Sequence, residues 1–541
     1  MFQNVAFWTT TKGPRLKGHR MYDVVIRGGT VIDGTGSAGY RADVAIVGDA
    51  ISAIGELSAS TAGSEINADG KIVCPGFIDI HTHTDFSLLV NPQAESKIRQ
   101  GVTTEIGGNC GGSIAPIGDH SLKQAQKSVQ EYGIEVDWRD MDKFLAKLED
   151  TRIGINYATF VGNGTVRSAV MGFEERRPTE AEMGRMKDEV AKAMRQGAIG
   201  LSTGLIYTPS LYADTDEIAE LAQVAAQHNG VYASHIRGEG ATLFEAIQEA
   251  VTIGERAQVG VQIAHLKASG QRNWGKARRA LEMIDEARSR GIDVTADRYP
   301  YLAGSTGLAY LLPTWIKDGG TDVMLERLKE PQISVKIKAY LNSTAKEIED
   351  YWNKVILCTD GSTIEEASKE RGMEPAEFVC QFLIEKDGRV SICHFSMCQE
   401  DTDLILKHPQ VMIASDSSAR SPYGKLGEGN PHPRGYGTFP RAIQEYVRER
   451  ELVDLPEMIR KMTSMPAARV GLVRRGQIKE GNYADICVFD YENVRDNATY
   501  AQPHQYPSGI EYVLVNGRVV IAEGDHTGKF PGKVIRGRPE L

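Results

Sequence analysis

The chain of 541 residues has no apolar run that approaches the roughly 20 residues of a membrane-spanning helix. It also has no long run of Lys or Arg, and its net charge is −10. These absences argue against anionic membrane surfaces and nucleic acid as partners, because an acidic chain is repelled by both. Residues 1–20 contain basic side chains but no apolar segment, so they are not expected to form a signal peptide.

Cysteine is scarce, and its positions are scattered. The seven cysteines are odd in number and show no close-paired spacing. They are Cys74, Cys110, Cys358, Cys380, Cys393, Cys398 and Cys487. This pattern argues against a disulfide framework and for a reducing compartment, so we expect a cytoplasmic protein.

The bulk composition is that of a globular enzyme, with 41% apolar and 25% charged residues. A chain of this length exceeds a single core, which predicts one large barrel with a smaller domain, or two to three domains. Met21 opens the first clear strand pattern. We therefore expect residues 1–20 to be a disordered extension or to precede the true start.

Both ends of the chain carry short β patterns. Apolar runs of about five residues are separated by turn residues, as in hairpins. These runs span residues 23–27, 30–33, 41–47, 484–490 and 510–521. Gly28 and Gly29 separate the first two runs. We predict that residues 21–75 and 468–541 together form a small β-sandwich domain, with the rest of the chain inserted between them.

Residues 76–467 alternate short apolar strands with amphipathic helices, which predicts βα units around a parallel sheet. The strand candidates span residues 77–80, 103–107, 155–161, 198–202, 231–235, 261–265, 293–297 and 411–416. Helices are predicted at residues 179–196 and 277–290, where apolar positions recur three and four apart. Eight strands predict an α/β fold, a TIM-like (β/α)8 barrel.

An insertion interrupts the barrel pattern at about residues 302–398. Residues 355–358 and 390–395 read as additional strands, so the insertion is expected to carry β structure of its own. Its length and its glycines, which can act as hinges, suggest a lid over the site.

The most informative stretch is GFIDIHTH at residues 76–83. Its apolar residues predict a buried strand, and His81 and His83 at the strand's end point to the same side because side chains alternate along a strand. Imidazole is a common ligand for zinc and similar ions. The two histidines therefore indicate half of a metal site.

Other ligand-type residues also close predicted strands. Cys110 follows the second strand in a glycine-rich stretch, His235 and His265 end the fifth and sixth, and Asp416 ends the last. The active site of such barrels lies where the carboxyl ends of the strands converge, so these side chains are expected to meet. Thiolate, imidazole and carboxylate are all zinc ligands. We read His394, His408 and His432, which lie outside this phase, as structural or loop residues.

This arrangement predicts metal-assisted hydrolysis. A bound metal lowers the pKa of water and polarises a carbonyl oxygen, so that hydroxide can attack an amide. Asp416 is the predicted general base, which takes the proton of the water and then delivers it to the leaving nitrogen.

The chain resembles the amidohydrolase superfamily in its terminal β segments, the motif at residues 76–83, the later histidines and Asp416. The resemblance covers nearly all of residues 22–525. Within the superfamily the chain is most similar to D-aminoacylases, the N-acyl-D-amino-acid deacylases. This narrower match is carried by residues 101–116, 299–306 and 432–441.

The resemblance implies a small-molecule substrate and zinc, with one ion bound tightly and a second position bound weakly. Cys110 would bridge the two positions, with His235 and His265 at the tight one and His81, His83 and Asp416 around the other. It further implies that Arg434 binds the α-carboxylate of the substrate, and that Lys267 and Tyr299 help to fix it or polarise the scissile carbonyl.

Three other functions stay open on the sequence. The first is a dipeptidase for peptides with a C-terminal D-residue, because a dipeptide is an acylated amino acid. The second is a cyclic-amide hydrolase similar to hydantoinases or dihydroorotases, which usually use a carboxylated lysine; none closes the strand near residues 200–204. The third is a non-catalytic assembly protein. Residues 417–431 form a longer loop than we expect of the simplest D-aminoacylases. The length of a loop at the mouth of the site can change which acyl group or amino-acid side chain of the substrate fits there.

Overall fold

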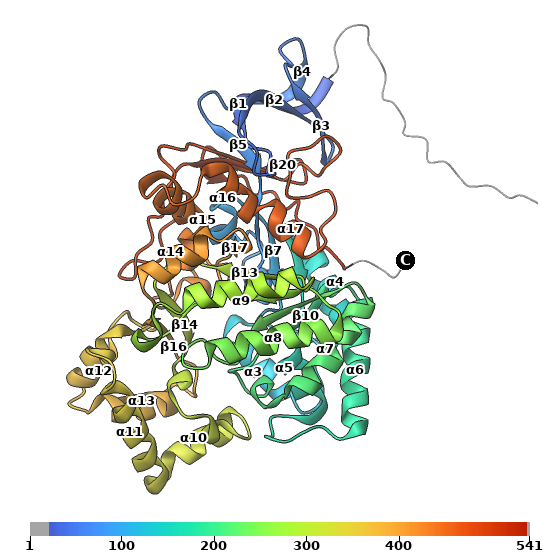
Figure 1. Cartoon of the computed structure of the whole chain (residues 1–541). Coiled ribbons are helices and arrows are strands. Elements are labelled where there is room, and N and C mark those ends of the chain that lie inside the picture. The colour runs from blue at the N-terminus through green and yellow to red at the C-terminus, as the bar shows by residue number, and fades with distance from the viewer. Residues whose placement is uncertain (1–20, 538–541) are drawn as a thin grey trace, which may run out of the picture.

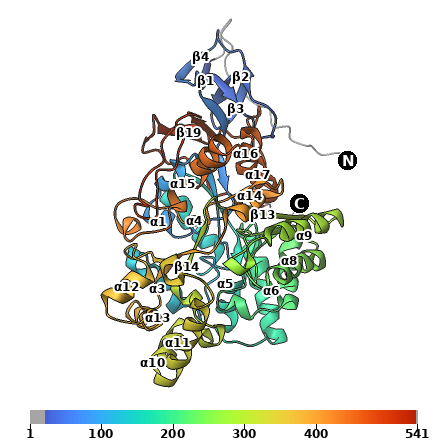
Figure 2. The ribbon, with the colours of Figure 1, turned by 60° about the vertical axis from the view of Figure 1, so that its left-hand side comes forward.

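The computed structural model describes residues 21–537. The predicted extension at residues 1–20 lies outside the described residues. A β domain and a mainly helical insertion lie at opposite ends of the molecule, with the barrel between them (Figures 1 and 2). Within the described part of the chain, no helix combines the length and apolar character needed to cross a membrane.

The barrel has eight parallel strand positions, as predicted. In order around the ring they are β6 (Phe77–Asp79), β7 (Val102–Gly107), β8 (Asn156–Thr159) with β9 (Val161–Gly162), β10 (Gly200–Gly204), β11 (Val231–His235), β12 (Val261–Ile263), β13 (Val294–Arg298) and β17 (Val411–Ile413). The ring closes between β17 and β6, where the Asp416 amide donates to the His81 carbonyl at 2.9 Å. The predicted fold class is therefore confirmed.

One strand position is split. β8 and β9 are separated at Phe160, whose amide donates to the Gly107 carbonyl at 3.0 Å. The Ile199 amide donates to the Thr159 carbonyl at 2.9 Å, which links β8 to the chain entering β10. β8 and β9 together therefore occupy the position of the single strand predicted at residues 155–161.

An apolar cluster fills the lower part of the barrel. It includes Ile80, Ile106, Ala158, Ala233 and Met412, which come from strand positions on opposite sides of the ring. Strands on opposite sides of a closed barrel share only its interior, so this cluster is the internal core. It supports the polar mouth above it.

Helices cover the outside of the barrel (Figure 1). They are α1 (Ser87–Val90), α2 (Glu95–Ile98), α4 (Met141–Thr151), α5 (Asn163–Met171), α6 (Glu180–Arg195), α7 (Thr215–Gln227), α8 (Leu243–Ala257), α9 (Ala277–Ser289), α14 (Gln399–Lys407), α15 (Arg434–Arg441), α16 (Leu455–Met462) and α17 (Ser464–Arg469). α3 (Leu122–Val129) belongs instead to the segment that connects β7 to α4. α6 begins at Thr179, which forms a capping box with Glu182, and it buries Met186 and Val190. The helices predicted at residues 179–196 and 277–290 are thus confirmed to within a residue or so at each end.

Strands from both chain ends share one nine-stranded sheet. They are β1 (Met21–Val31), β2 (Tyr40–Val47), β3 (Ala50–Gly55), β4 (Thr61–Asn67), β5 (Ile72–Pro75), β18 (Ile486–Phe489), β19 (Ile510–Val515), β20 (Arg518–Ala522) and β21 (Asp525–His526). β5 pairs with β18 and so joins the two ends. Ile51 of β3 shares a core with Leu514 of β19, although these strands are far apart in the sheet, so the sheet folds over itself.

The expected turn between the first two β runs is absent. Residues 23–27 and 30–33 were predicted to be separate strands, but β1 continues through Gly28 and Gly29. Its pairing with β2 shifts register between Ile26 and Gly29, and Gly28 has φ +68°. The one extra residue of β1 is accommodated as a bulge, which glycine tolerates because it has no Cβ.

The region of the predicted insertion contains its own small sheet and core. Its elements are β14 (Ala303–Gly307), α10 (Thr321–Lys329), α11 (Pro331–Ala345), β15 (Val355–Leu357), α12 (Ile364–Glu370), α13 (Pro375–Glu385) and β16 (Ser391–Phe395). Both predicted additional strands are present as β15 and β16, which pair antiparallel. Ile337, Phe378 and Ile392 belong to one buried apolar cluster between these elements.

A buried lysine ties the closing strands of the barrel together. Lys97 of α2 is fully buried, and its ammonium group lies 2.8 Å from Asp79 Oδ2 and 3.2 Å from Glu105 Oε1. It also donates to Ser415 Oγ at 2.6 Å. Burial raises the pKa of Glu105 to about 7, although Lys97 opposes the shift. The ammonium therefore neutralises carboxylates of β6 and β7 and holds the segment after β17 beside them.

We predict that Lys97→Met lowers the free energy of unfolding by about 3–5 kcal/mol, because two buried carboxylates lose their shared cation. Lys329→Met is the matched control, since Lys329 pairs with Glu326 on the surface and exposed pairs contribute little. Urea unfolding followed by circular dichroism measures both. Equal stability of the two variants would contradict this role for Lys97.

Candidate metal centre

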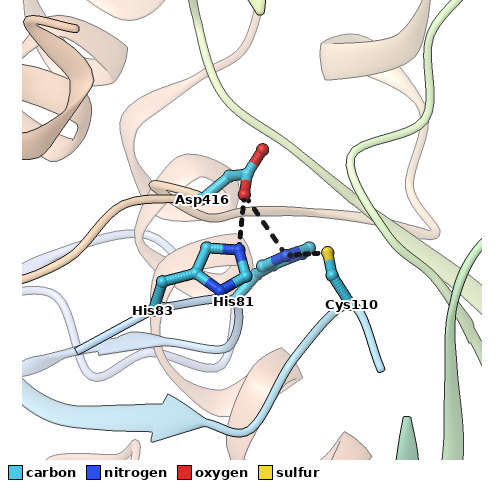
Figure 3. A group of neighbouring side chains, drawn as sticks. All are labelled: His81, His83, Cys110 and Asp416. Carbon is cyan, nitrogen blue, oxygen red and sulfur yellow. Dashed lines mark hydrogen bonds and ion pairs between the residues drawn. The ribbon is translucent and has the colours of Figure 1, made fainter. Parts of the chain in front are cut away.

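His81 and His83 follow β6 at the barrel mouth. The Nε2 atom of His81 lies 3.2 Å from the Cys110 sulfur and 3.4 Å from Asp416 Oδ1. His83 Nε2 lies 3.1 Å from the same carboxylate oxygen. Figure 3 shows the four side chains directed at one another. His81, His83, Cys110 and Asp416 thus each bring a ligand-type atom within 4.8 Å of the others.

A tight turn carries Cys110 to this position. It follows β7 within a glycine-rich loop that presses against neighbouring strands. A Cβ on Gly108 would lie 2.2 Å from the Phe160 carbonyl oxygen, and one on Gly111 would lie 2.6 Å from the Gly204 nitrogen. Both glycines have positive φ. Only glycine fits these positions without a shift of the backbone, so the glycines allow the loop to present Cys110.

A second group shares Cys110. His265 Nε2 lies 3.7 Å from the Cys110 sulfur and 2.9 Å from His235 Nδ1. His235 ends β11, and His265 lies just beyond β12. The ligand-type atoms of Cys110, His235 and His265 also lie within 4.8 Å of one another. All six side chains predicted to surround the metal therefore meet at one mouth, with Cys110 in both groups.

Three of these six residues have backbone conformations that are rare for residues with side chains. Their φ angles are +52° at Cys110, +35° at His265 and +50° at Asp416. Such conformations cost of order 1–3 kcal/mol each and cluster at functional sites. The backbone is therefore strained at these three positions, and the strained conformations direct the side chains into the barrel mouth.

Two acidic residues that we did not predict support the histidines. Asp297 Oδ1 accepts from the His265 amide at 2.7 Å and lies 3.2 Å from His81 Nδ1. Glu239 Oε1 lies 2.9 Å from His265 Nδ1. Asp297 closes the predicted strand at residues 293–297, so its strand-end position could have revealed it. Glu239 lies in an irregular segment after β11, where no periodic pattern points to it.

The mouth favours the anionic form of the thiol. Burial raises the pKa of the Cys110 thiol, but His81 and hydrogen bonds from His235 and His265 outweigh it and hold the pKa well below its ordinary value. Burial opposes ionisation of Asp416 as well, yet Arg434, His81 and His265 hold its pKa well below the usual range. Thiolate and carboxylate are the forms that ligate metals.

The residues fit a divalent metal. A buried carboxylate, a half-buried thiolate and several imidazole nitrogens converge, and the buried Nε2 of His235 has no hydrogen-bond partner among the described residues. Burial lowers the pKa of His265, as does Lys267, but Glu239 and Asp416 raise it to about 9. Without a metal, protonated imidazole therefore supplies the positive charge that balances the anions. A soft or borderline cation such as zinc satisfies the same donor set.

The three predicted substrate-binding residues line the same cavity, whose volume is about 660 Å³. Arg434 begins α15, and its NH1 lies 2.9 Å from Asp416 Oδ2. Its guanidinium group stacks over the Tyr299 ring at 4.6 Å. Lys267 contacts the Glu239 carboxylate closely and lies 2.9 Å from His265 Nδ1. Arg434 and Tyr299 therefore lie together, whereas Lys267 lies against the histidines.

His432 is buried beside this pair. Its Nδ1 accepts from the Arg434 amide at 3.0 Å, and its Nε2 lies 2.9 Å from the Ala303 carbonyl oxygen. These contacts anchor the start of α15, in keeping with the structural role predicted for this histidine.

Comparisons with known proteins agree on one family. A family model described as "Amidohydrolase family" matches residues 64–521. D-aminoacylase of Alcaligenes xylosoxydans xylosoxydans is 36% identical over 514 residues, which cover 95% of this chain and 97% of that protein. A solved structure of D-aminoacylase with a binuclear metal centre has a TM-score of 0.80 at 34% identity and covers 95% of this chain and 100% of its own.

A further solved structure is that of N-acyl-D-glutamate deacylase from Bordetella bronchiseptica, in complex with zinc and a phosphonate that mimics the tetrahedral intermediate. It is 32% identical, with a TM-score of 0.80, and covers 96% of this chain and 100% of its own.

We predict that Cys110 in the metal-free protein is alkylated by iodoacetamide at a rate that stays high as the pH falls from about 9 to 7, because its pKa is depressed. Cys398 is the internal control, since burial raises its pKa. Mass spectrometry of the two peptides measures both rates. A rate at Cys110 that falls about tenfold per pH unit, as for a thiol of ordinary pKa, would contradict the depressed pKa.

Proposed function

This chain belongs to the amidohydrolase family, and we propose that it is a zinc-dependent hydrolase that cleaves the amide bond of N-acyl-D-amino acids to a carboxylate and a free D-amino acid. The observation that carries the proposal is the meeting of six ligand-type side chains beside a buried arginine. The names of the relatives, D-aminoacylase and N-acyl-D-glutamate deacylase, support the substrate class.

Cys110, His235 and His265 would hold the firmly bound zinc. His81, His83 and Asp416 would surround a second position, with Cys110 between the two. Bound zinc would supply a Lewis acid that polarises the scissile carbonyl and lowers the pKa of water. Asp297 and Glu239 would keep the imidazole rings of His81 and His265 in place through their contacts with Nδ1.

Asp416 would act as general base and then as general acid. It takes the proton of the attacking water on a carboxylate oxygen and delivers it to the leaving nitrogen. In the protein without substrate, the Arg434 guanidinium is the nearest cation to Asp416 and helps to hold its pKa down. A substrate carboxylate that engages Arg434 would share this cation, so binding would make Asp416 more basic when a base is needed.

Arg434 would bind the α-carboxylate of the substrate, because a planar guanidinium matches a carboxylate with two parallel hydrogen bonds. Its buried Nε has no hydrogen-bond partner among the described residues, whereas NH1 is paired with Asp416 Oδ2 at 2.9 Å in the protein without substrate. Tyr299 would fix the guanidinium by stacking, and Lys267 would help to polarise the scissile carbonyl beside His265.

The rival functions have less support. The names of the relatives favour neither a D-dipeptidase nor a cyclic-amide hydrolase. A non-catalytic assembly protein would have no need of a complete ligand set. We also propose a cytoplasmic location, which is supported by seven cysteines that are all free.

We predict that the zinc-loaded protein hydrolyses N-acetyl-D-amino acids faster than their L-enantiomers across a matched panel of side chains. Treatment with a chelator should abolish the activity, and added zinc should restore it. Release of free amino acid measures both effects. Faster hydrolysis of the L series would refute the substrate assignment and leave only an amidohydrolase.

We predict that Asp416→Asn lowers kcat by roughly 100-fold or more, because the amide cannot accept the proton of the water. The zinc held by Cys110, His235 and His265 should remain, as measured by elemental analysis. Asp285→Asn, a change at the surface partner of His408, is the matched control. A kcat of Asp416→Asn close to that of the control would contradict the role of Asp416.

A further inference from the structure

The cavity that contains the metal centre continues well beyond it. Part of its wall is formed by residues that follow β7, β8–β9 and β10. We call this part the distal arm; it comprises the cavity-lining residues within 113–138, 164–173 and 206–210. Tyr207 is excluded, because its ring lies 5.1 Å from that of His235 at the metal centre. The mechanism outlined above uses none of these residues, yet they form a large share of the lining.

One wall of the distal arm is a face of α3. The residues of this segment that line the cavity are Ser121, Gln124, Ala125, Ser128 and Val129. Their spacing of three and four places them on one side of the helix. Lys127 points elsewhere and lies 3.5 Å from Asp322 of α10. α3 therefore directs its lysines outward and uncharged side chains, among them the polar Gln124, into the cavity.

The rest of the arm is also uncharged. Ile114, Ile117 and Trp138 line it on the side of the loop after β7, and Ser168 and Phe173 line it on the side of α5. None of the described residues that line the distal arm carries a charged side chain. The charged residues of the cavity are confined to the metal centre and the neighbourhood of Arg434.

Several hydroxyl groups of the arm already donate to backbone carbonyls, and Ser210 Oγ donates to Asn163 Oδ1 at 2.7 Å. Ser128 Oγ donates to the Ala125 carbonyl at 2.7 Å, and Ser168 Oγ donates to the Thr165 carbonyl at 2.9 Å. The Trp138 indole N–H also donates to a backbone carbonyl of the wall. Because these donors already have acceptors within the protein, an apolar group can enter the arm without leaving them unpaired.

The arm lies across the barrel mouth from Arg434. Its residues follow the second to fourth strand positions of the ring, whereas Tyr299 and Arg434 follow the seventh and eighth. In an eight-stranded ring these sectors are half a turn apart, with the metal ligands between them. If the α-carboxylate binds Arg434 and the scissile carbonyl lies at the metal centre, the acyl chain on the far side of the carbonyl carbon points into the arm.

We propose, on the basis of the proposed function, that the distal arm is an acyl subsite and that this enzyme prefers long apolar N-acyl groups to acetyl. A single methyl group leaves the arm empty, whereas a chain of several methylenes buries apolar surface against Ile114, Ile117 and Trp138. Burial of each methylene in the transition state favours hydrolysis by about fourfold until the arm is full.

The test compares N-acetyl, N-butanoyl, N-hexanoyl and N-octanoyl derivatives of one D-amino acid on the zinc-loaded enzyme. We expect kcat/KM to rise with chain length, by at least about tenfold from acetyl to octanoyl. An acetyl substrate that is as good as or better than the octanoyl one would overturn the acyl preference alone. Failure to hydrolyse any of these substrates would instead refute the proposed function.

Two variants test whether the preference for the octanoyl substrate arises in the distal arm. Ala125→Phe and Ser168→Phe place a ring into the arm from two different segments, and neither residue is a metal ligand. Each should remove the advantage of the octanoyl chain and leave kcat/KM for the acetyl substrate close to the wild-type value, which also shows that the variant is folded. An octanoyl advantage that persists in both, or an equal loss on both substrates in both, would overturn the assignment of the arm.

Discussion

The structure depends on holding two anions, the half-buried Cys110 and the buried Asp416, at the mouth of a closed barrel. Neither is stable there without positive charge, because removal of a charge from water is costly unless it is compensated. Imidazoles from three other strand ends and the Arg434 guanidinium supply that compensation. The same set of atoms is suited to a metal ion, so the need to balance charge and the capacity for chemistry have one origin.

The scaffold below and around the mouth serves this arrangement. The apolar cluster in the barrel interior supports the strand ends, and Lys97 holds the closing segment beside β6 and β7. Positive φ angles at Cys110, His265 and Asp416 turn these side chains inward at a local cost in free energy. Stability elsewhere in the fold therefore offsets strain at the site.

The sequence predicted the barrel and the six converging side chains because both follow from local rules. Strand periodicity identifies strand ends, and parallel strands of a barrel bring those ends together. What escaped prediction depends on tertiary contacts. Glu239 lies in an irregular segment, the bulge at Gly28 and Gly29 replaced an expected turn, and the distal arm is formed by three segments whose proximity appears only in the folded chain.

The central claim is that Cys110 ligates zinc together with imidazoles at this mouth. X-ray absorption spectroscopy at the zinc edge of the purified protein tests it most directly. The account predicts one sulfur at about 2.3 Å together with nitrogen or oxygen ligands, and loss of the sulfur in Cys110→Ser. A zinc spectrum without a sulfur ligand, or one that Cys110→Ser leaves unchanged, would contradict it.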